Sequence, residues 1–202
     1  MNGQNKVSGV VLAGGMARRM QGQDKGLLIC HNRPLVSYAL AAMNPLVNEL
    51  FVSANRHQDQ YRQFNYPVIS DAELSFDGPL AGILAAMQTA QHPILLVAPC
   101  DSPLVASMHL QRLLDALISQ DADIAVAFDG ERLHPVFAAL KTRLQSDLQN
   151  YLHSGERKLQ AWFHRHSLVE VDFSDSQHLF VNINTPAELS AVEQSLAEIL
   201  PQ

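Results

Sequence analysis

The stretch VSGVVLAGGMARRMQGQDKG, Val7 to Gly26, joins a short apolar run to a loop that is rich in glycine and cations. The apolar run has the Val- and Leu-rich composition of a strand that is buried on both faces. Two adjacent glycines follow, and the loop then holds Arg18, Arg19 and Lys25, three of the 14 cations of a chain whose formal net charge is −6. This arrangement predicts a strand that leads into a binding loop for a small anionic group.

The first half of the chain alternates between apolar runs typical of strands and amphipathic segments typical of helices. We expect strands at Val7–Leu12, Glu49–Ser53, Pro67–Ser70 and Ile94–Ala98. We expect helices at Pro34–Met43, Pro79–Ala90 and Ser107–Gln120. This alternation predicts a mostly parallel sheet that is covered by helices on both faces.

The second half of the chain has a different pattern. Asp129 and Gly130 lie between two apolar runs, which predicts a β-hairpin. The strands expected here are Asp123–Phe128, Leu133–Leu140, Leu168–Asp172 and Leu179–Val181, and the helices are Lys141–Ser154, Arg157–His166 and one that starts with the capping box Thr185-Pro186-Ala187-Glu188. We therefore predict one α/β domain over residues 1–202, with a small C-terminal elaboration.

Composition excludes several classes of protein. A length of 202 residues suits one domain with a substantial core. A pI near 5.8 argues against binding to nucleic acid or to an anionic membrane surface, which needs a dominant positive field. The start of the chain lacks the layout of a signal peptide, and no apolar run approaches the roughly 18 to 20 residues of a membrane-spanning helix. Cys30 and Cys100 are far apart, so we expect neither a disulfide nor a zinc site, and we expect a cytoplasmic location.

Three nucleotide-loop patterns can be compared with the opening stretch. The dinucleotide pattern G-x-G-x-x-G and the P-loop pattern G-x-x-x-x-G-K-[ST] are both absent. The third pattern, L-x-G-G-x-x-x-R-M-x-x-x-D-K, matches at Leu12, Gly14, Gly15, Arg19, Met20, Asp24 and Lys25. The glycines allow backbone N–H groups to approach phosphate oxygens, while Arg19 and Lys25 are suited to neutralise a triphosphate. The loop therefore predicts phosphate binding.

This loop resembles the signature of nucleotidyltransferases of the nucleotide-sugar pyrophosphorylase type. Further segments resemble, in the same order, those of the molybdenum cofactor guanylyltransferases (molybdopterin-guanine dinucleotide synthases). They are VSANRH (Val52–His57), GPLAGILAAM (Gly78–Met87), PCDSP (Pro99–Pro103), HPVFAAL (His134–Leu140), GERK (Gly155–Lys158) and NINTPAEL (Asn182–Leu189). The resemblance covers nearly the whole chain. It implies a three-layer Rossmann-like nucleotidyltransferase fold and transfer of GMP from GTP to molybdenum-molybdopterin, with release of pyrophosphate.

Asp101 is the candidate ligand for a magnesium ion. It follows the apolar strand that ends near Ala98, and ligands of open parallel sheets bind beyond the carboxyl ends of strands. Mg²⁺ commonly takes one or two carboxylates together with phosphate oxygens and water. The resemblance also assigns this aspartate to the metal, and a turn cap before the next helix is the alternative. We expect catalysis by positioning and charge neutralisation through Arg19, Lys25 and Asp101, with Cys100 as a small buried residue rather than a nucleophile.

The resemblance implies a set of residues that contact GTP. They are Leu12, Ala13, Gly14, Gly15, Lys25, Ser53, Asn55, Asp71, Gly78, Pro79, Leu80 and Asp101. Asp71 follows a predicted strand, and a turn or cap role is its alternative. Some family members carry Asn at the position of Ser53, whose hydroxyl is shorter; Asn55 shares the same face of the expected strand and offers a substitute contact.

For the acceptor, the resemblance implies contacts from Arg157, Asn182 and Asn184 with molybdopterin. A solvated helix start for Arg157 and local turn bonds for the two asparagines are equally compatible with the sequence. The resemblance also implies transient contacts with molybdoenzymes or with other proteins of cofactor biosynthesis. Transfer of another nucleotide, to a sugar phosphate, to methylerythritol phosphate or to a cytosine form of the cofactor, stays open as an alternative, and so does a noncatalytic nucleotide sensor.

Overall fold

A seven-stranded sheet forms the centre of the protein in the computed structural model, which describes residues 6–13, 16–17, 23–71, 78–181, 183 and 185–199. Its strands are β1 (Val7–Leu12), β6 (Glu49–Ser53), β7 (Val68–Ile69), β8 (Ile94–Pro99), β9 (Ile124–Phe128), β10 (Leu133–Lys141) and β11 (Leu168–Asp172). Their spatial order is β11-β9-β10-β8-β1-β6-β7, and only β10 runs antiparallel to its neighbours. The predicted mostly parallel sheet is confirmed, and so is the hairpin of β9 and β10.

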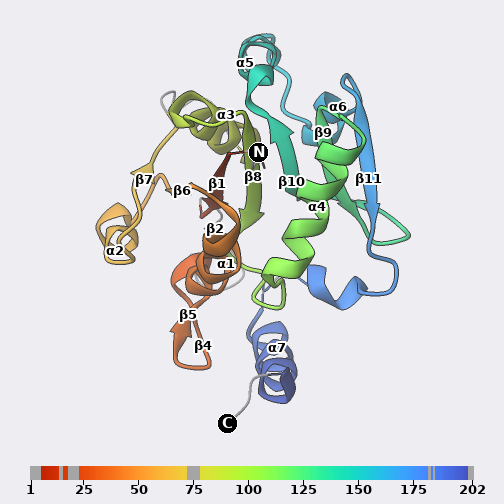
Figure 1. The fold of residues 1–202 in the computed structure, drawn as a ribbon. Coiled ribbons are helices and arrows are strands. Elements are labelled where there is room, and N and C mark those ends of the chain that lie inside the picture. The colour runs from red at the N-terminus through yellow and green to blue at the C-terminus, as the bar shows by residue number, and fades with distance from the viewer. Residues whose placement is uncertain are drawn as a thin grey trace.

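Helices cover both faces of this sheet, as predicted (Figure 1). One face packs against α1 (Leu35–Met43) and α4 (Ser107–Ser119), and the other packs against α3 (Pro79–Thr89), α5 (Gln145–His153) and α6 (Leu159–Phe163). Successive side chains of a strand alternate between the faces, so Val11 joins the first core and Val10 the second, both without exposed surface. The continuous apolar runs of β1 and β8 are explained by this burial on two sides.

The carboxyl ends of β1, β6, β7, β8, β9 and β11 meet at one edge of the sheet, because these strands run in the same direction. We call this the carboxyl edge. In Figure 1 the arrow of β8 points toward the end of the molecule that carries α7 (Pro186–Ile199) and the ribbon of β4 (Ile29–Cys30) and β5 (Arg33–Pro34). A third small core joins α7 to this ribbon and to α1. Thr185 Oγ1 accepts a hydrogen bond from Glu188 N at 3.2 Å, which confirms the predicted start of the last helix.

Three predicted segments differ from the structure. The strand predicted at Leu179–Val181 is wrong: residues Gln177–Phe180 form the 3-10 helix η5, which buries Leu179 and Phe180 together instead of alternating them across a sheet. The helix predicted from Lys141 begins at Gln145, because Lys141 still pairs with β8 and the 3-10 helix η4 (Thr142–Leu144) intervenes.

The helix predicted at Arg157–His166 is also too long, since α6 covers only Leu159–Phe163. Several short elements were not predicted: β2 (Met16–Ala17), β3 (Gln23–Asp24), the ribbon of β4 and β5, α2 (Gln58–Arg62), and the 3-10 helices η2 (Lys25–Leu27) and η3 (Asn44–Leu46). Elements of two to five residues are too short to show a periodic apolar pattern, so the sequence carries little signal for them.

Candidate functional site

Lys25 and Asp101 form an ion pair at the carboxyl edge. Lys25 Nζ lies 3.0 Å from Asp101 Oδ2, and the two side chains are 14% and 12% exposed. Lys25 begins η2 directly after β3, whereas Asp101 follows the end of β8 by two residues. Asp101 does not cap the next helix, because the residue that precedes α4 is Ala106. The fold therefore brings two of the three predicted catalytic residues together, and the third, Arg19, lies outside the described residues together with Arg18.

The end of β1 is tied into the sheet by backbone hydrogen bonds. Leu12 O accepts from Cys100 N at 3.1 Å, and Ala13 N donates to Ser53 O at 2.8 Å. The Leu12 carbonyl and the Ala13 N–H, which belong to two predicted GTP contacts, are therefore already bonded within the protein. The next predicted contacts, Gly14 and Gly15, lie outside the described residues.

Asp71 and Asn55 hold each other by two hydrogen bonds. Asn55 Nδ2 donates to Asp71 Oδ2 at 2.8 Å, and Asp71 N donates to Asn55 Oδ1 at 3.0 Å. The other carboxylate oxygen, Asp71 Oδ1, is buried and has no hydrogen-bond partner among the described residues. Burial raises the pKa of Asp71, and the hydrogen bond from Asn55 partly opposes this rise. A buried carboxylate oxygen that lacks a donor is a suitable position for a donor group of a bound ligand.

Ser53 has a different environment from Asn55. Its side chain is buried against α3, since a Cβ atom placed on Gly82 would lie 2.7 Å from Ser53 Oγ. Asn55 lies beyond the end of β6 and supports Asp71, so its amide is already engaged. The structure thus gives Ser53 a packing contact and Asn55 a supporting role at this corner of the site.

The start of α3 presents backbone rather than polar side chains to the carboxyl edge. Gly78 precedes the helix with φ 99°, a conformation that favours glycine, and Pro79 is the first helical residue. Apart from Gly78 and its two chain neighbours, no atom of the described residues lies within 4 Å of the position that a Cβ atom would take at Gly78. Leu80 is buried in the core at 1% exposure. A ligand at this point would therefore meet the backbone of Gly78.

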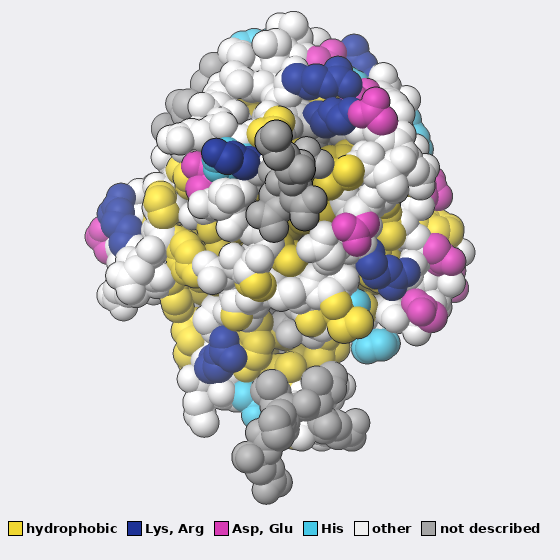
Figure 2. All heavy atoms as spheres, in the orientation of Figure 1, with side chains coloured by type: hydrophobic (Ala, Val, Ile, Leu, Met, Phe, Trp, Pro, Cys, Tyr) yellow, Lys and Arg dark blue, Asp and Glu magenta, His cyan; other side chains and the backbone are white. Residues whose placement is uncertain are grey.

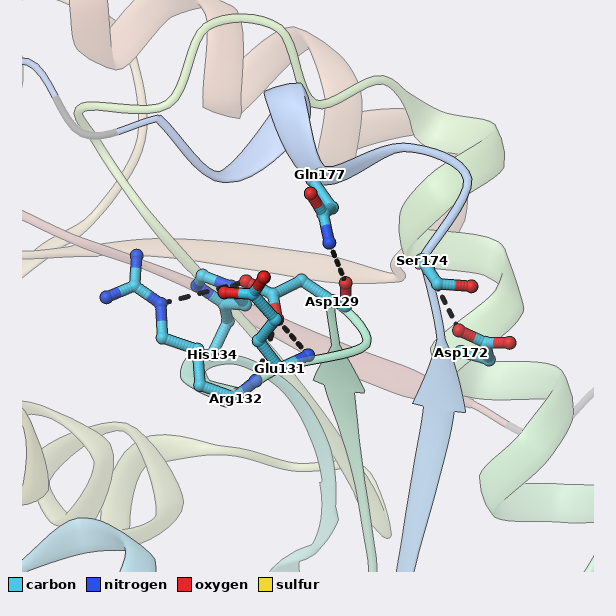
Figure 3. A network of polar contacts seen from close by, with 7 residues as sticks. All are labelled: Asp129, Glu131, Arg132, His134, Asp172, Ser174 and Gln177. Carbon is cyan, nitrogen blue, oxygen red and sulfur yellow. Dashed lines mark hydrogen bonds and ion pairs between the residues drawn. The ribbon is translucent and has the colours of Figure 1, made fainter.

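The hairpin of β9 and β10 carries a polar network at the other half of the carboxyl edge (Figure 3). Asp129 Oδ1 accepts from the backbone N–H groups of Glu131 and Arg132 at 2.9 and 2.8 Å. His134 Nε2 lies 2.6 Å from Asp129 Oδ2, and Gln177 Nε2 donates to the Asp129 carbonyl at 2.7 Å. The hydrogen bond from His134 and those from the two backbone N–H groups hold the pKa of Asp129 well below its usual range.

This network also fixes the segment that follows β11. The ring of His134 stacks on Phe180 with centroids 4.2 Å apart and an angle of 15° between the rings. Asp172, the last residue of β11, accepts a hydrogen bond from Ser174 N at 2.8 Å. The sequence placed Asp129 in the predicted hairpin turn and His134 at the start of the motif HPVFAAL, but it did not indicate that the two side chains meet. The network also includes Gln177 and Phe180 of η5, which lie far along the chain, so no local sequence pattern indicates these two contacts.

Arg157 closes the carboxyl end of α5. Its Nη1 donates to the carbonyl oxygens of Leu152 and Glu156, both at 2.7 Å. Such a contact satisfies a backbone acceptor that a helix leaves open at this end. Asn182 and Asn184, the other predicted acceptor contacts, lie outside the described residues, and Ile183 between them is fully buried. The structure thus shows a helix-capping role for Arg157.

The distribution of charged and metal-ligating side chains limits the kinds of site that the described residues can form. Figure 2 shows Lys and Arg side chains in several small, separate groups on the face of the molecule that it draws. Among the described residues no group of three or more His, Cys, Asp or Glu could hold a metal ion, and no helix is long and apolar enough to cross a membrane. Cys100 is buried as a free thiol, and burial raises its pKa. A thiolate nucleophile is therefore disfavoured at this position.

Comparisons with known proteins find similarity over nearly the whole chain. Residues 9–171 match the MobA-like NTP transferase domain. The chain is 42% identical to the molybdenum cofactor guanylyltransferase of Shewanella loihica over 95% of this chain and 98% of that protein. It is 43% identical to the protein of the same name from Shewanella halifaxensis, over 95% and 96% of the two chains.

Solved structures show the same fold. Molybdopterin-guanine dinucleotide biosynthesis protein A from Archaeoglobus fulgidus superposes with a TM-score of 0.79 at 23% identity, over 95% of this chain and 99% of that chain. CMP:2-keto-3-deoxy-manno-octonic acid synthetase gives 0.75 at 15% identity, over 96% and 100% of the two chains. The nucleotidyltransferase fold is therefore shown by structure, while the narrower assignment comes from sequence identity. By that identity, which extends over nearly its whole length, the chain belongs to the molybdenum cofactor guanylyltransferase family.

Proposed function

We propose that this protein transfers GMP from GTP to molybdenum-molybdopterin and releases pyrophosphate, in a reaction that depends on Mg²⁺. The observation that carries this proposal is the ion pair of Lys25 and Asp101 at the carboxyl edge, where a signature lysine meets the carboxylate at the end of a central strand. Family membership supports the identity of the two substrates. Cytoplasmic location and transient contacts with other proteins of cofactor biosynthesis stay predictions from the sequence.

The residues at this edge fit a magnesium ion that is shared with a nucleotide. Asp101 supplies a carboxylate, and Mg²⁺ prefers oxygen ligands. Because the described residues contain no larger cluster of ligands, the other coordination positions would be filled by phosphate oxygens and water. When bound, the ion would supply charge stabilisation to the transferring phosphoryl group. Lys25 lies beside the same carboxylate and is placed to bind phosphate oxygens there.

Asp71 is too far along the edge to share that ion. Three strand spacings separate the ends of β7 and β8, which amounts to about 14 Å. We assign Asp71 to the nucleoside end of GTP, where the buried Oδ1 can accept a hydrogen bond from a donor group of the ligand. Backbone at Gly78 would then face the base. The nucleotide would lie across the ends of β7, β6, β1 and β8, with its phosphates at Lys25.

The reaction needs little covalent chemistry from the protein. A terminal phosphate oxygen of the acceptor, already ionised, attacks the α-phosphorus of GTP. The new phosphorus–oxygen bond forms as the bond to the pyrophosphate group breaks, and pyrophosphate leaves with the bonding electrons. Lys25, together with the signature residue Arg19, orients the phosphates and neutralises their charge. Arg157, Asn182 and Asn184 are proposed to contact the acceptor.

The decisive test is product formation by the purified full-length protein. GTP, molybdenum-molybdopterin and Mg²⁺ should give one pyrophosphate for each guanine dinucleotide formed, and a chelator should stop the reaction. CTP, ATP and UTP are tested in parallel, since the fold is shared with an enzyme solved with CTP. A clear preference for CTP, or pyrophosphate release without the dinucleotide, would contradict the proposed function.

A further inference from the structure

Lys25 is a partly buried residue between two buried neighbours, Asp24 of the signature and Gly26. Asp24 and Gly26 lie in the interior, and the Asp24 side chain is only 5% exposed. A carboxylate at such a site is costly unless hydrogen bonds compensate for the loss of water. The partners of Asp24 therefore decide how firmly the backbone on either side of Lys25 is held.

Both oxygens of Asp24 are engaged. Oδ1 accepts a hydrogen bond from Gly26 N at 3.2 Å and another from the hydroxyl of Tyr61. Oδ2 lies 3.1 Å from His57 Nδ1, which donates to it in the tautomer that carries hydrogen on Nδ1. The contact with Gly26 folds the chain around Lys25, and the contacts with Tyr61 and His57 anchor that fold to α2.

Tyr61 is a buried donor with no other evident function. Its side chain has no exposed surface, and α2 places it one helical turn after His57. Burial raises the pKa of Tyr61 far above its usual value, so its hydroxyl stays protonated and continues to donate. His57 adopts a left-handed backbone conformation, with φ 50° and ψ 30°, which is uncommon for residues other than glycine. This turn brings the chain from the end of β6 into α2, so that both side chains face Asp24.

Gly26 makes this contact sterically feasible. A Cβ atom at Gly26 would lie 2.5 Å from Tyr61 Oη and 3.2 Å from Cys100 Sγ. Gly26 is therefore packed between the tyrosine hydroxyl and the residue that precedes Asp101. The lysine is fixed in this way from two sides: its backbone through Asp24 and Gly26, and its Nζ through the ion pair with Asp101.

We propose that Tyr61 and His57 are positioning residues that hold Lys25 at the nucleotide phosphates by acting through Asp24. We call this set of four residues, Asp24, Gly26, His57 and Tyr61, the lysine clamp. The inference rests on the proposed role of Lys25 in GTP binding and catalysis. It explains why the signature requires aspartate before the lysine: the carboxylate is a structural acceptor within the loop, not a ligand of the substrate.

The test is a double-mutant cycle on the full-length protein. Tyr61→Phe removes only the hydroxyl, and Tyr66→Phe is the matched control, because it removes a hydroxyl that bonds to Asn44 on the surface. Tyr61→Phe should lower kcat/KM for GTP about tenfold in the wild-type background and less than twofold in the Lys25→Ala background. Equal losses in both backgrounds, or no loss in either, would overturn the clamp.

A second variant, His57→Gly, tests the other side chain that contacts Asp24. NMR spectra of the lysine side chains test the lysine clamp without relying on activity. His57→Gly removes the half-exposed imidazole, suits the left-handed conformation, and should lower kcat/KM by a smaller factor. The chain has only four lysines, so NMR spectra of the protein labelled at the lysine side chains contain few signals. The signal that disappears in Lys25→Arg is assigned to Lys25. Tyr61→Phe should shift the Lys25 signal, and Tyr66→Phe should leave it in place. An unshifted Lys25 signal in Tyr61→Phe contradicts the lysine clamp. Absence of guanylyl transfer by the wild-type protein contradicts the proposed function instead, and the NMR spectra then still test the lysine clamp.

Discussion

The two halves of the carboxyl edge treat their polar side chains differently. At the ends of β7 and β8, Asp71 has one buried oxygen without a partner among the described residues, and Asp101 forms a partly buried ion pair with the signature lysine. At the ends of β9 and β11, Asp129 uses both carboxylate oxygens and its carbonyl within the protein, and Asp172 is bonded to the following loop. The first half thus retains a hydrogen-bond acceptor that a ligand can use, whereas the acceptors of the second half are already bonded within the protein.

This difference leads to different expectations for ligand binding and for stability in the two halves. A half with an unpaired buried oxygen gains hydrogen bonds when a ligand enters, so its residues should matter more for binding than for stability. A half whose polar groups are already paired should respond in the opposite way. Arg157 belongs to the second pattern in this structure, because it caps α5, although we propose that it also contacts the acceptor.

The largest effect is expected from Asp101→Ala. Loss of the proposed magnesium ligand removes several kcal/mol of charge stabilisation, so turnover should fall about a hundredfold or more. The protein should stay folded, because the side chain lies at the edge. Asp115→Ala, on the exposed side of α4, is the control. Pyrophosphate release is the measurement, and a near-normal rate in the Asp101 variant would refute the metal assignment.

Lys25→Ala and Arg19→Ala should each lower kcat/KM at least about tenfold, because a charge-assisted hydrogen bond contributes about 1.5 to 3 kcal/mol. Arg18→Ala is the matched control within the same loop, and its effect should be several-fold smaller. Initial rates at varied GTP concentration, measured for the three variants, give the comparison. Three equal losses would show a diffuse positive patch in place of a defined phosphate site.

Arg157→Ala should spare GTP affinity, impair transfer to molybdopterin several-fold, and lower the free energy of unfolding by about 1 kcal/mol through loss of the α5 cap. Arg165→Ala removes a nearby cation that stacks on Tyr151 and serves as the control. Asn182→Ala and Asn184→Ala should impair transfer alone. Collapse of GTP affinity in any of these variants would contradict the proposed assignment of these three residues to the acceptor.

Asp129→Asn should destabilise the fold and leave GTP affinity unchanged. The folded-state pKa of Asp129 lies below the unfolded value of about 3.9, so its stabilisation is complete above that pH and is lost as the pH falls further. Thermal unfolding midpoints measured from pH 7 to pH 3 should therefore drop less steeply for the variant than for the wild type. Parallel curves would show that Asp129 is not coupled to its partners as the distances indicate.

Asp71→Asn should have the opposite sign and the smallest effect on stability. Its folded-state pKa is raised by burial, so the ionised carboxylate disfavours folding once the pH rises through that value. At pH 7 the free energy of unfolding should stay level or rise slightly in the variant, while GTP affinity falls. A stability loss with normal GTP affinity would place Asp71 in the fold and not in the nucleotide site.

The sequence by itself determined the class of the fold and the location of the nucleotide loop. The alternation of apolar runs with amphipathic segments is visible locally in the sequence. The apolar side chains of β1 and β8 leave water only when both faces of these strands are covered. The motif around Lys25 likewise specifies its chemistry within a few residues. The same local reasoning was wrong at Leu179–Val181, where a stack on His134 decides the conformation of the chain.

Only the tertiary structure decided which of these residues meet. Strand order places β10 between β8 and β9 and separates the ends of β7 and β8 by about 14 Å, and the packing of α2 brings Tyr61 into contact with Asp24. No periodic pattern connects Asp24 with Tyr61 or Asp129 with Gln177, because each pair joins elements that are distant along the chain. Such contacts depend on how the layers pack, since a hydrogen bond between distant residues forms only where the buried faces of several helices and strands have already fixed both backbones.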